Sequence, residues 1–247
     1  MRYSFLLVFT LLLFPSQTAA SSEKIIRESF VSQNKKRSIY LFVPESVKSG
    51  MPAPLIILLH GSGRNGLSLA DKWKDLASKE GIILVGPDSI DSSRWSSPVD
   101  GPDFLRDVVE NVKTRCTINP RRVYLFGHSG GAVFALYMSL FESKYFAATA
   151  IHAGALRQQD AAIALAKRKT PIAMFVGTRD RFFPVEDVRG TRDDLNKQGF
   201  AVALTELPGH DHNYYDLASK INTSAWEFLK KHELDEDPQY EVYQWNR

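Results

Sequence analysis

The chain has 247 residues, of which 44% are hydrophobic and 24% charged, with 15 glycines and 12 prolines. This composition is typical of a globular protein and excludes a disordered chain, a collagen-like fibre and a small disulfide scaffold. The 31 basic and 28 acidic residues nearly cancel, and the basic clusters are short and scattered. We therefore expect no nucleic-acid partner.

The first twenty residues are typical of a secretory signal peptide. Arg2 precedes an apolar run over 5–14, and the small residues Thr18, Ala19 and Ala20 follow it. The run is shorter than the roughly 20 apolar residues that cross a bilayer, so we expect cleavage after Ala20 rather than a permanent membrane anchor. An uncleaved anchor is the alternative. The predicted organisation is a signal peptide over 1–20, one domain over 21–233 and a C-terminal tail over 234–247, with the mature protein secreted or periplasmic.

Strand and helix patterns alternate along the domain. A polar and apolar alternation over 37–43 predicts an antiparallel edge strand. Six apolar segments predict further strands: 55–60, 82–85, 123–126, 146–151, 172–176 and 202–207. Helical patterns occupy 69–79, 104–115, 131–140, 160–168, 188–198 and 216–232. Asp100 and Asp103 precede one of these helices and are expected to satisfy free N–H groups at its start. The alternation predicts a mainly parallel sheet covered by helices on both faces.

A glycine-rich turn joins the strand 123–126 to the helix 131–140. Its sequence is Gly127-His128-Ser129-Gly130-Gly131, which matches G-x-S-x-G between a strand and a helix. Such a sharp turn exposes the serine hydroxyl and needs small neighbours so that strand and helix can approach. We therefore predict that Ser129 is a nucleophile, with an ordinary glycine-rich turn as the alternative.

A serine hydroxyl needs a base to take its proton, and an acid to orient that base. The expected chain order is Ser, Asp or Glu, then His. Asp180 follows the strand 172–176, where such sheets carry their sites. A plain turn role for Asp180 is the alternative, and Asp187 and Asp193 are weaker candidates because they fall inside the next predicted helix.

Two histidines follow the strand 202–207. His212 is preferred as the base because the turn at Pro208-Gly209 needs a few residues to bring the chain back over the sheet edge. His210 is the alternative, and the histidine that is not the base is expected in a surface loop or in contact with substrate.

The segment His60-Gly61-Ser62-Gly63 also ends a strand and frees backbone N–H groups. We expect the N–H groups of Ser62 and Gly130 to form an oxyanion hole, and His60 to be a structural hydrogen-bonding residue. No spacing of His, Asp and Glu resembles a metal site, so we expect neither a metal nor a cofactor. The single Cys116 has no disulfide partner and is expected to be a small buried residue.

With these residues in place, the chain resembles α/β-hydrolases. It is similar, over about 38–229, to secreted esterases grouped with polyhydroxybutyrate depolymerases and with feruloyl or acetylxylan esterases (carbohydrate esterase family one). The resemblance is carried by 54–61, by 118–124 leading into 127–131, and by 177–180. The segment Asp211-His212-Asn213-Tyr214-Tyr215 is similar to the catalytic-histidine segment of S-formylglutathione hydrolases, which supports His212. Many depolymerase-type relatives carry Cys where this chain has Ser62.

The resemblance implies a serine esterase that acts on a small-molecule or polymer-linked ester. Only about 20 residues separate His152 from Pro171 and a predicted helix fills most of them, so we expect no large lid. Trp95 is expected either to stack on substrate or to pack on its own loop. A serine peptidase and a catalytically inactive binding protein are the rival functions. The tail over 234–247 either packs on the body, binds a partner or is disordered.

Overall fold

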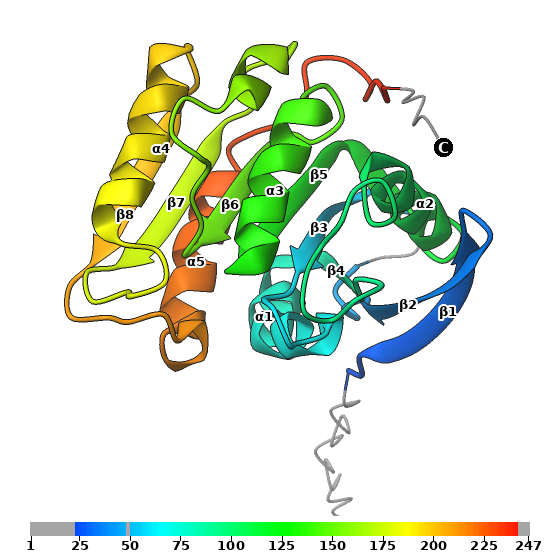
Figure 1. Cartoon of the computed structure of the whole chain (residues 1–247). Coiled ribbons are helices and arrows are strands. Elements are labelled where there is room, and N and C mark those ends of the chain that lie inside the picture. Colours follow the sequence, from blue (N-terminus) through cyan, green and yellow to red (C-terminus); the bar gives the residue numbers. More distant parts are fainter. Residues whose placement is uncertain (1–22, 48–49, 242–247) are drawn as a thin grey trace, which may run out of the picture.

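The computed structural model describes residues 23–47 and 50–241 (Figure 1). The predicted signal peptide lies outside these residues. Within them, eight strands form one sheet in the order β1-β2-β4-β3-β5-β6-β7-β8. The strands are β1 (Ile26–Ser32), β2 (Lys35–Phe42), β3 (Ala53–Leu59), β4 (Ile83–Pro87), β5 (Ile118–His128), β6 (Ala148–His152), β7 (Ile172–Gly177) and β8 (Val202–Leu207).

The sheet is parallel from β4 to β8, as predicted, and antiparallel where β2 pairs with β4 and with β1. The prediction that 37–43 forms an edge strand is wrong, because β1 pairs beyond β2. A two-residue turn at Gln33 and Asn34, both with positive φ, joins the two strands. The sequence does not reveal β1 because two of its three apolar side chains, Ile26 and Val31, are 57% and 72% exposed, so that Phe30 alone packs on the core.

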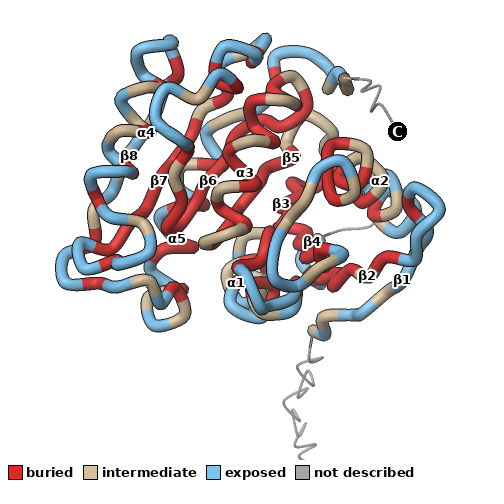
Figure 2. Tube along the Cα trace, viewed as in Figure 1, coloured by how far each residue is buried: buried red, intermediate tan, exposed pale blue. Residues whose placement is uncertain are grey.

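Helices cover both faces of the sheet, as the near-continuous apolar strands require. The five α-helices of the described chain are α1 (Gly66–Glu80), α2 (Pro102–Lys113), α3 (Gly130–Phe141), α4 (Val185–Lys197) and α5 (Ala218–Leu229). Alternate residues of β3 belong to two separate cores: Leu55 and Ile57 pack with α2, α3 and α4, whereas Ile56 and Leu58 pack with α1 and α5. The strands β3, β4, β6 and β7 are accordingly buried along their whole length, whereas β1 and β8 at the two ends of the sheet are largely exposed or half-buried (Figure 2).

The prediction of a helix over 160–168 is wrong. Only a short 3₁₀ helix, η1 (Ala161–Leu165), forms between β6 and β7. The helix ends at Leu165 because Arg168 bonds to a different part of the chain. Its N–H donates to Ser143 Oγ at 3.1 Å, and its guanidinium donates to the carbonyls of Phe146 and Ala147. Ala162 and Ile163 are buried, so this stretch packs on the body.

The start of α2 also differs from the prediction. Gly101 is its N-cap residue and no side chain caps the helix. Asp103 does lie in the first turn, but Asp100 pairs with Arg37 instead. The Asp100 carboxylate, which the local sequence pattern assigned to the start of α2, therefore forms a long-range ion pair instead.

The described part of the C-terminal tail packs on the body. Leu234 is buried, and its N–H donates to the carbonyl of Arg121 at 3.0 Å. The Tyr240 hydroxyl donates to Asp103, and the Tyr240 ring lies edge-on to Tyr145. In the described ranges, no helix is both long and apolar enough to cross a membrane.

Candidate active site

The Ser129 turn has the strained backbone that its motif predicts. Ser129 joins β5 to α3 with φ 55° and ψ −121°, a conformation that L-residues rarely adopt. Its N–H donates to the carbonyl of His152 at 3.0 Å. The strain is held by the surrounding fold, and it presents the hydroxyl at the C-terminal edge of the central strand.

The glycines beside Ser129 are required by backbone contacts. A Cβ on Gly127 would lie 2.3 Å from the carbonyl oxygen of Gly131. A Cβ on Gly131 would lie 2.0 Å from the carbonyl oxygen of Leu59, in the neighbouring strand β3. Because both obstacles are backbone atoms, neither position accepts a side chain without moving α3 away from the sheet.

A chain of hydrogen bonds connects Ser129, His212 and Asp180. His212 Nε2 lies 2.9 Å from Ser129 Oγ, and His212 Nδ1 lies 2.9 Å from Asp180 Oδ2. The carboxylate can only accept from Nδ1–H, which leaves Nε2 free to accept the serine proton. The structure therefore brings together the three residues predicted from chain order, although they come from separate loops after β5, β7 and β8.

Asp180 is held firmly in this arrangement. Its side chain has no exposed surface. Its second oxygen, Oδ1, accepts the backbone N–H groups of Phe182 and Phe183, each at 2.9 Å. The carboxylate is thus fixed by three hydrogen bonds, two of them from the loop that follows it.

The loop that carries His212 is anchored from beneath. Tyr214, fully buried in the short helix η2 (Tyr214–Asp216), donates through its hydroxyl to Asn222 Oδ1 at 2.6 Å. Asn222 Nδ2 then donates to the carbonyl of Lys72 in α1 at 2.8 Å. These buried bonds connect the His212 loop to α5 and α1.

Within the described residues, His212 and not His210 forms the hydrogen bond to Ser129 Oγ. The His210 ring is buried and 5.3 Å from the ring of His152, and its Nε2 has no hydrogen-bond partner in the described structure. A Cβ on Gly177 would lie 2.2 Å from the His210 carbonyl oxygen, so backbone packing holds this position against β7.

The predicted oxyanion turn lies against the serine turn. A Cβ built on Gly61 would contact Ser129 Cβ at 3.3 Å, and one built on Gly130 would lie 2.8 Å from Ser62 Oγ. Gly130 begins α3, where the first N–H groups have no partner within the helix. The amide N–H of Ser62 donates to no oxygen within the part of the chain that the structure describes. Both predicted donors are thus next to Ser129.

His60 has the structural role predicted for it. Its Nδ1–H donates to the Gly61 carbonyl at 2.9 Å, and its Nε2 accepts from the Ser89 N–H at 3.2 Å. Burial lowers the pKa of His60, which keeps Nε2 available as an acceptor. The His60 carbonyl accepts from Trp95 Nε1 at 2.8 Å, and the Trp95 ring stacks on Phe134. Trp95 is therefore packed within the protein.

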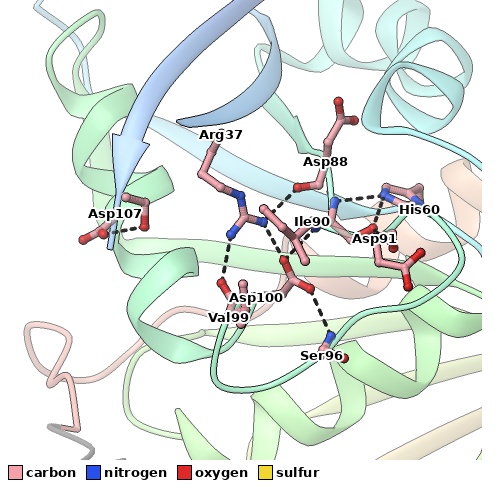
Figure 3. A network of polar contacts seen from close by, with 11 residues as sticks. Arg37, His60, Asp88, Ile90, Asp91, Ser96, Val99, Asp100 and Asp107 are labelled. Atoms are coloured by element: carbon pink, nitrogen blue, oxygen red, sulfur yellow. Dashed lines mark hydrogen bonds and ion pairs between the residues drawn. The ribbon is translucent and has the colours of Figure 1, made fainter. Parts of the chain in front are cut away.

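A buried ion pair between Arg37 and Asp100 fixes the loop over 88–100, which contacts the turn that begins at His60 (Figure 3). Arg37 Nη2 lies 2.6 Å from Asp100 Oδ1, and both side chains are almost fully buried. Asp100 also accepts the N–H groups of Ile90 and Ser96, each at 3.0 Å. Arg37 donates further to the carbonyls of Asp88 and Val99. The loop over 88–100 is thereby tied to β2.

The sequence profile of the dienelactone hydrolase family matches residues 92–233, more than half of the chain. The chain belongs to the dienelactone hydrolase family. The matched region contains Ser129, Asp180 and His212, and the predicted oxyanion turn over 60–63 precedes it.

This member of the dienelactone hydrolase family is also similar to two curated proteins and to one solved structure. The chain is 25% identical over 197 residues to a bifunctional acetylxylan esterase/xylanase of Neocallimastix patriciarum, covering 76% of this chain and 29% of the relative. It is 29% identical over 155 residues to poly(3-hydroxyalkanoate) depolymerase C of Paucimonas lemoignei, covering 57% and 37%. The chain thus spans about a third of the length of these relatives.

The solved structure is a ferulic acid esterase of Anaeromyces mucronatus in complex with ferulic acid. It superimposes with a TM-score of 0.67 at 15% identity and covers 86% of this chain and 93% of that one. At this identity the likeness shows the fold, which is the α/β-hydrolase fold that the sequence predicts.

A pocket of about 940 Å³ opens over Ser129 in this dienelactone hydrolase family member. Sequence reasoning had placed Ser62, Ser129, Asp180 and His212 there, but it missed most of the remaining lining. The additional side chains of the lining are Arg64, His128, Arg179, Arg181, Phe182, Asp211, Asn213 and Tyr215. Adjacency to Asp180 and His212 in the sequence was the available signal for Arg179, Arg181, Phe182, Asp211 and Asn213.

Among the residues that the structure describes, no group of three or more His, Cys, Asp or Glu side chains could hold a metal ion. Cys116 is partly buried, burial raises the pKa of its thiol, and it is a free cysteine.

Proposed function

We propose that the chain is a secreted serine ester hydrolase that acts on short-chain, feruloyl, acetyl or polyester-type esters through Ser129, His212 and Asp180. The observation that carries this proposal is the continuous hydrogen-bonded chain from Ser129 Oγ through His212 to the buried Asp180 carboxylate. The names of the two curated relatives, an acetylxylan esterase/xylanase and a polyester depolymerase, support an ester bond as the target.

In the first half of the reaction, Ser129 Oγ attacks the ester carbonyl carbon while its proton passes to His212 Nε2. Asp180 stabilises the imidazolium that forms. The carbonyl oxygen becomes an anion and accepts hydrogen bonds from the N–H groups of Ser62 and Gly130. When the carbon–oxygen bond to the alcohol breaks, His212 returns the proton to the departing alcohol and an acyl-serine remains.

In the second half, a water molecule attacks the acyl-serine carbonyl and gives its proton to His212. The bond to Ser129 Oγ then breaks, His212 protonates the serine, and the acid is released. No redox partner is needed, because one ester and one water become one acid and one alcohol.

Initial hydrolysis rates of 4-nitrophenyl acetate and methyl ferulate test the proposal. The chain starting at Ser21 should hydrolyse at least one of them, and Ser129→Ala should lose nearly all of that rate, on the order of 10³-fold or more. Ser219→Ala, at an exposed serine of α5 outside the pocket, is the matched control and should retain it. A folded wild-type protein without activity on either ester would contradict the proposal and return a peptidase or an inactive binding protein to consideration.

Export is part of the same proposal. It is supported by Arg2, the apolar run over 5–14 and the small residues that end at Ala20. Expression of the full chain, followed by N-terminal sequencing of the protein outside the cytoplasm, should give a mature chain that starts at Ser21. A chain that retains Met1 and stays with the membrane would show an uncleaved anchor instead.

A further inference from the structure

The solvent-facing charge of the pocket is predominantly positive. Arg64, Arg179 and Arg181 line it and are all exposed. Asp180 does not offset them, because its side chain is fully buried and bonded to His212. Asp211 is the exposed carboxylate of the same lining, and its Oδ1 accepts the N–H of Asn213 at 2.8 Å.

No carboxylate forms an ion pair with these three guanidinium groups in the part of the chain that the structure describes. Many exposed arginines elsewhere in the chain, such as Arg189 with Glu206, form close ion pairs. None of the three pocket arginines forms an ion pair or a side-chain hydrogen bond with any residue that the structure describes. Arg64 lies over the ring of Tyr215, 5.1 Å from its centroid, which orients its guanidinium group without neutralising it.

The arginines approach Ser129 from two directions. Arg64 follows β3, which lies on one side of β5 in the sheet, whereas Arg179 and Arg181 follow β7, which lies on the other. Because Ser129 directly follows β5, the positive groups stand on both sides of the serine along the edge of the sheet. An extended anionic chain that crosses the serine would meet both groups, whereas a single small carboxylate would meet one.

We propose that this pocket binds esters carried on a carboxylate-bearing polymer, such as an acidic polysaccharide, with the arginines contacting carboxylates on either side of the ester. A guanidinium group presents planar paired donors that match a carboxylate, and hydrogen bonds between charged groups are stronger than neutral ones. This inference rests on the proposed esterase function and names its substrate class. The ester bond that breaks is the one already described.

The test compares matched neutral and anionic substrates at low ionic strength. Acetylated xylan and 4-nitrophenyl acetate are the neutral probes, and acetylated polygalacturonate and 4-nitrophenyl hydrogen succinate are the anionic ones. The measured quantity is the ratio of kcat/KM for the anionic to the neutral member of each pair. The polymer ratio should fall by about threefold to tenfold in Arg64→Gln and again in Arg179→Gln/Arg181→Gln.

The matched control is Arg27→Gln, which removes one exposed positive charge on β1, at the opposite end of the sheet from β8. Its ratio should equal that of the wild type. Added salt of about 0.5 M should lower the wild-type polymer ratio toward that of the arginine variants, because salt screens exposed charges. A polymer ratio that neither salt nor the arginine replacements change would overturn the inference.

Binding separates this inference from the proposed function. Titration of polygalacturonate into Ser129→Ala should show binding that weakens by a similar factor when the arginines are replaced. If the wild-type protein hydrolyses no ester but this binding persists, the esterase proposal fails and the anionic subsite stands. If esters are hydrolysed with equal ratios and Ser129→Ala does not bind polygalacturonate, the subsite fails and the esterase stands. A charge preference confined to 4-nitrophenyl hydrogen succinate would overturn the polymer assignment.

Discussion

The rings of His212, His128 and His152 lie close to one another near Ser129, and their surroundings give them different roles. His212, partly exposed, contacts the serine and the buried carboxylate. His128 and His152 are buried, with their Nδ1 atoms 3.1 Å apart. Burial lowers the pKa of His128 to about 4 and that of His152 to about 2. These two rings therefore stay neutral at neutral pH and add no positive charge beside His212.

Their burial predicts a pH dependence of stability. In the unfolded chain both histidines titrate near pH 6.5. Between that pH and about 4 the unfolded chain therefore binds more protons than the folded one, so the free energy of unfolding falls as the pH is lowered. In His152→Leu, the fall between pH 7 and 4.5 should be smaller than in the wild type by roughly 2–3 kcal/mol.

Urea denaturation at several pH values measures this difference. His232→Leu is the control, because His232 is less buried and its replacement should alter the slope less. Parallel pH profiles for the wild type and His152→Leu would show that His152 does not contribute.

At the scale of the elements, the loop over 88–100 connects β2 to the turn beside Ser129. The Ser92 carbonyl accepts from Gly63 N–H at 2.7 Å, and Ser89 bonds to His60, so this loop supports the predicted oxyanion turn. Asp88 Oδ1 accepts from Gly66 N–H at the start of α1. The Arg37–Asp100 pair holds the base of the loop.

Asp100→Asn should therefore affect both stability and turnover. It leaves the buried Arg37 guanidinium without its carboxylate, which should lower the free energy of unfolding by about 3–5 kcal/mol. Loosening of the loop should also lower kcat for ester hydrolysis, with a smaller change in KM. Chemical denaturation and steady-state kinetics measure the two effects.

The control is Asp71→Asn, which breaks the exposed Lys74–Asp71 pair and should cost about 1 kcal/mol or less. If Asp100→Asn matched this control in stability and in kcat, the loop would not depend on the buried pair.

Some helices and strands could be predicted from the sequence and others could not, for a physical reason. The parallel strands and α1, α2, α3, α4 and α5 were predicted because burial against two cores produces strong apolar periodicity. β1 and η1 were not, because β1 exposes Ile26 and Val31 and η1 is cut short by hydrogen bonds from Arg168. Where long-range bonds override local preference, the local pattern is misleading.

At the scale of the whole molecule, the described part of the C-terminal tail, over 234–241, packs on the body of the domain. Leu234 is 3% exposed and packs with the core that contains α1 and α5. Its carbonyl accepts from Arg121 Nε at 2.7 Å, which closes a second bond between the tail and β5. The tail therefore extends the hydrolase fold past α5.

Leu234→Ala should lower the free energy of unfolding by about 2–3 kcal/mol, because it leaves a cavity in the core. Hydrolysis by the folded fraction should be retained, since Leu234 does not line the pocket over Ser129. Leu165→Ala, at a leucine that is 62% exposed, should change stability by less than about 0.5 kcal/mol. Equal thermal unfolding temperatures for the two variants would contradict packing of the tail.

The amino-acid sequence sufficed for the fold class and for the candidate residues Ser129, Asp180 and His212. Those features leave local traces: apolar periodicity in the strands, a strand–turn–helix around Ser129, and a carboxylate and an imidazole just past strand ends. The sequence favours His212 over His210, and the path of the loop in the structure places His212 Nε2 2.9 Å from Ser129 Oγ.

The pairing of Arg37 with Asp100 and the convergence of three arginines on the pocket were visible only in three dimensions. Arg37 and Asp100 are 63 residues apart, and Arg64 and Arg179 follow different strands. The total charge of the chain is nearly balanced and does not reveal this local excess of positive charge. Total charge sums over all residues, whereas binding depends on the few side chains that the order of the strands brings together in the pocket.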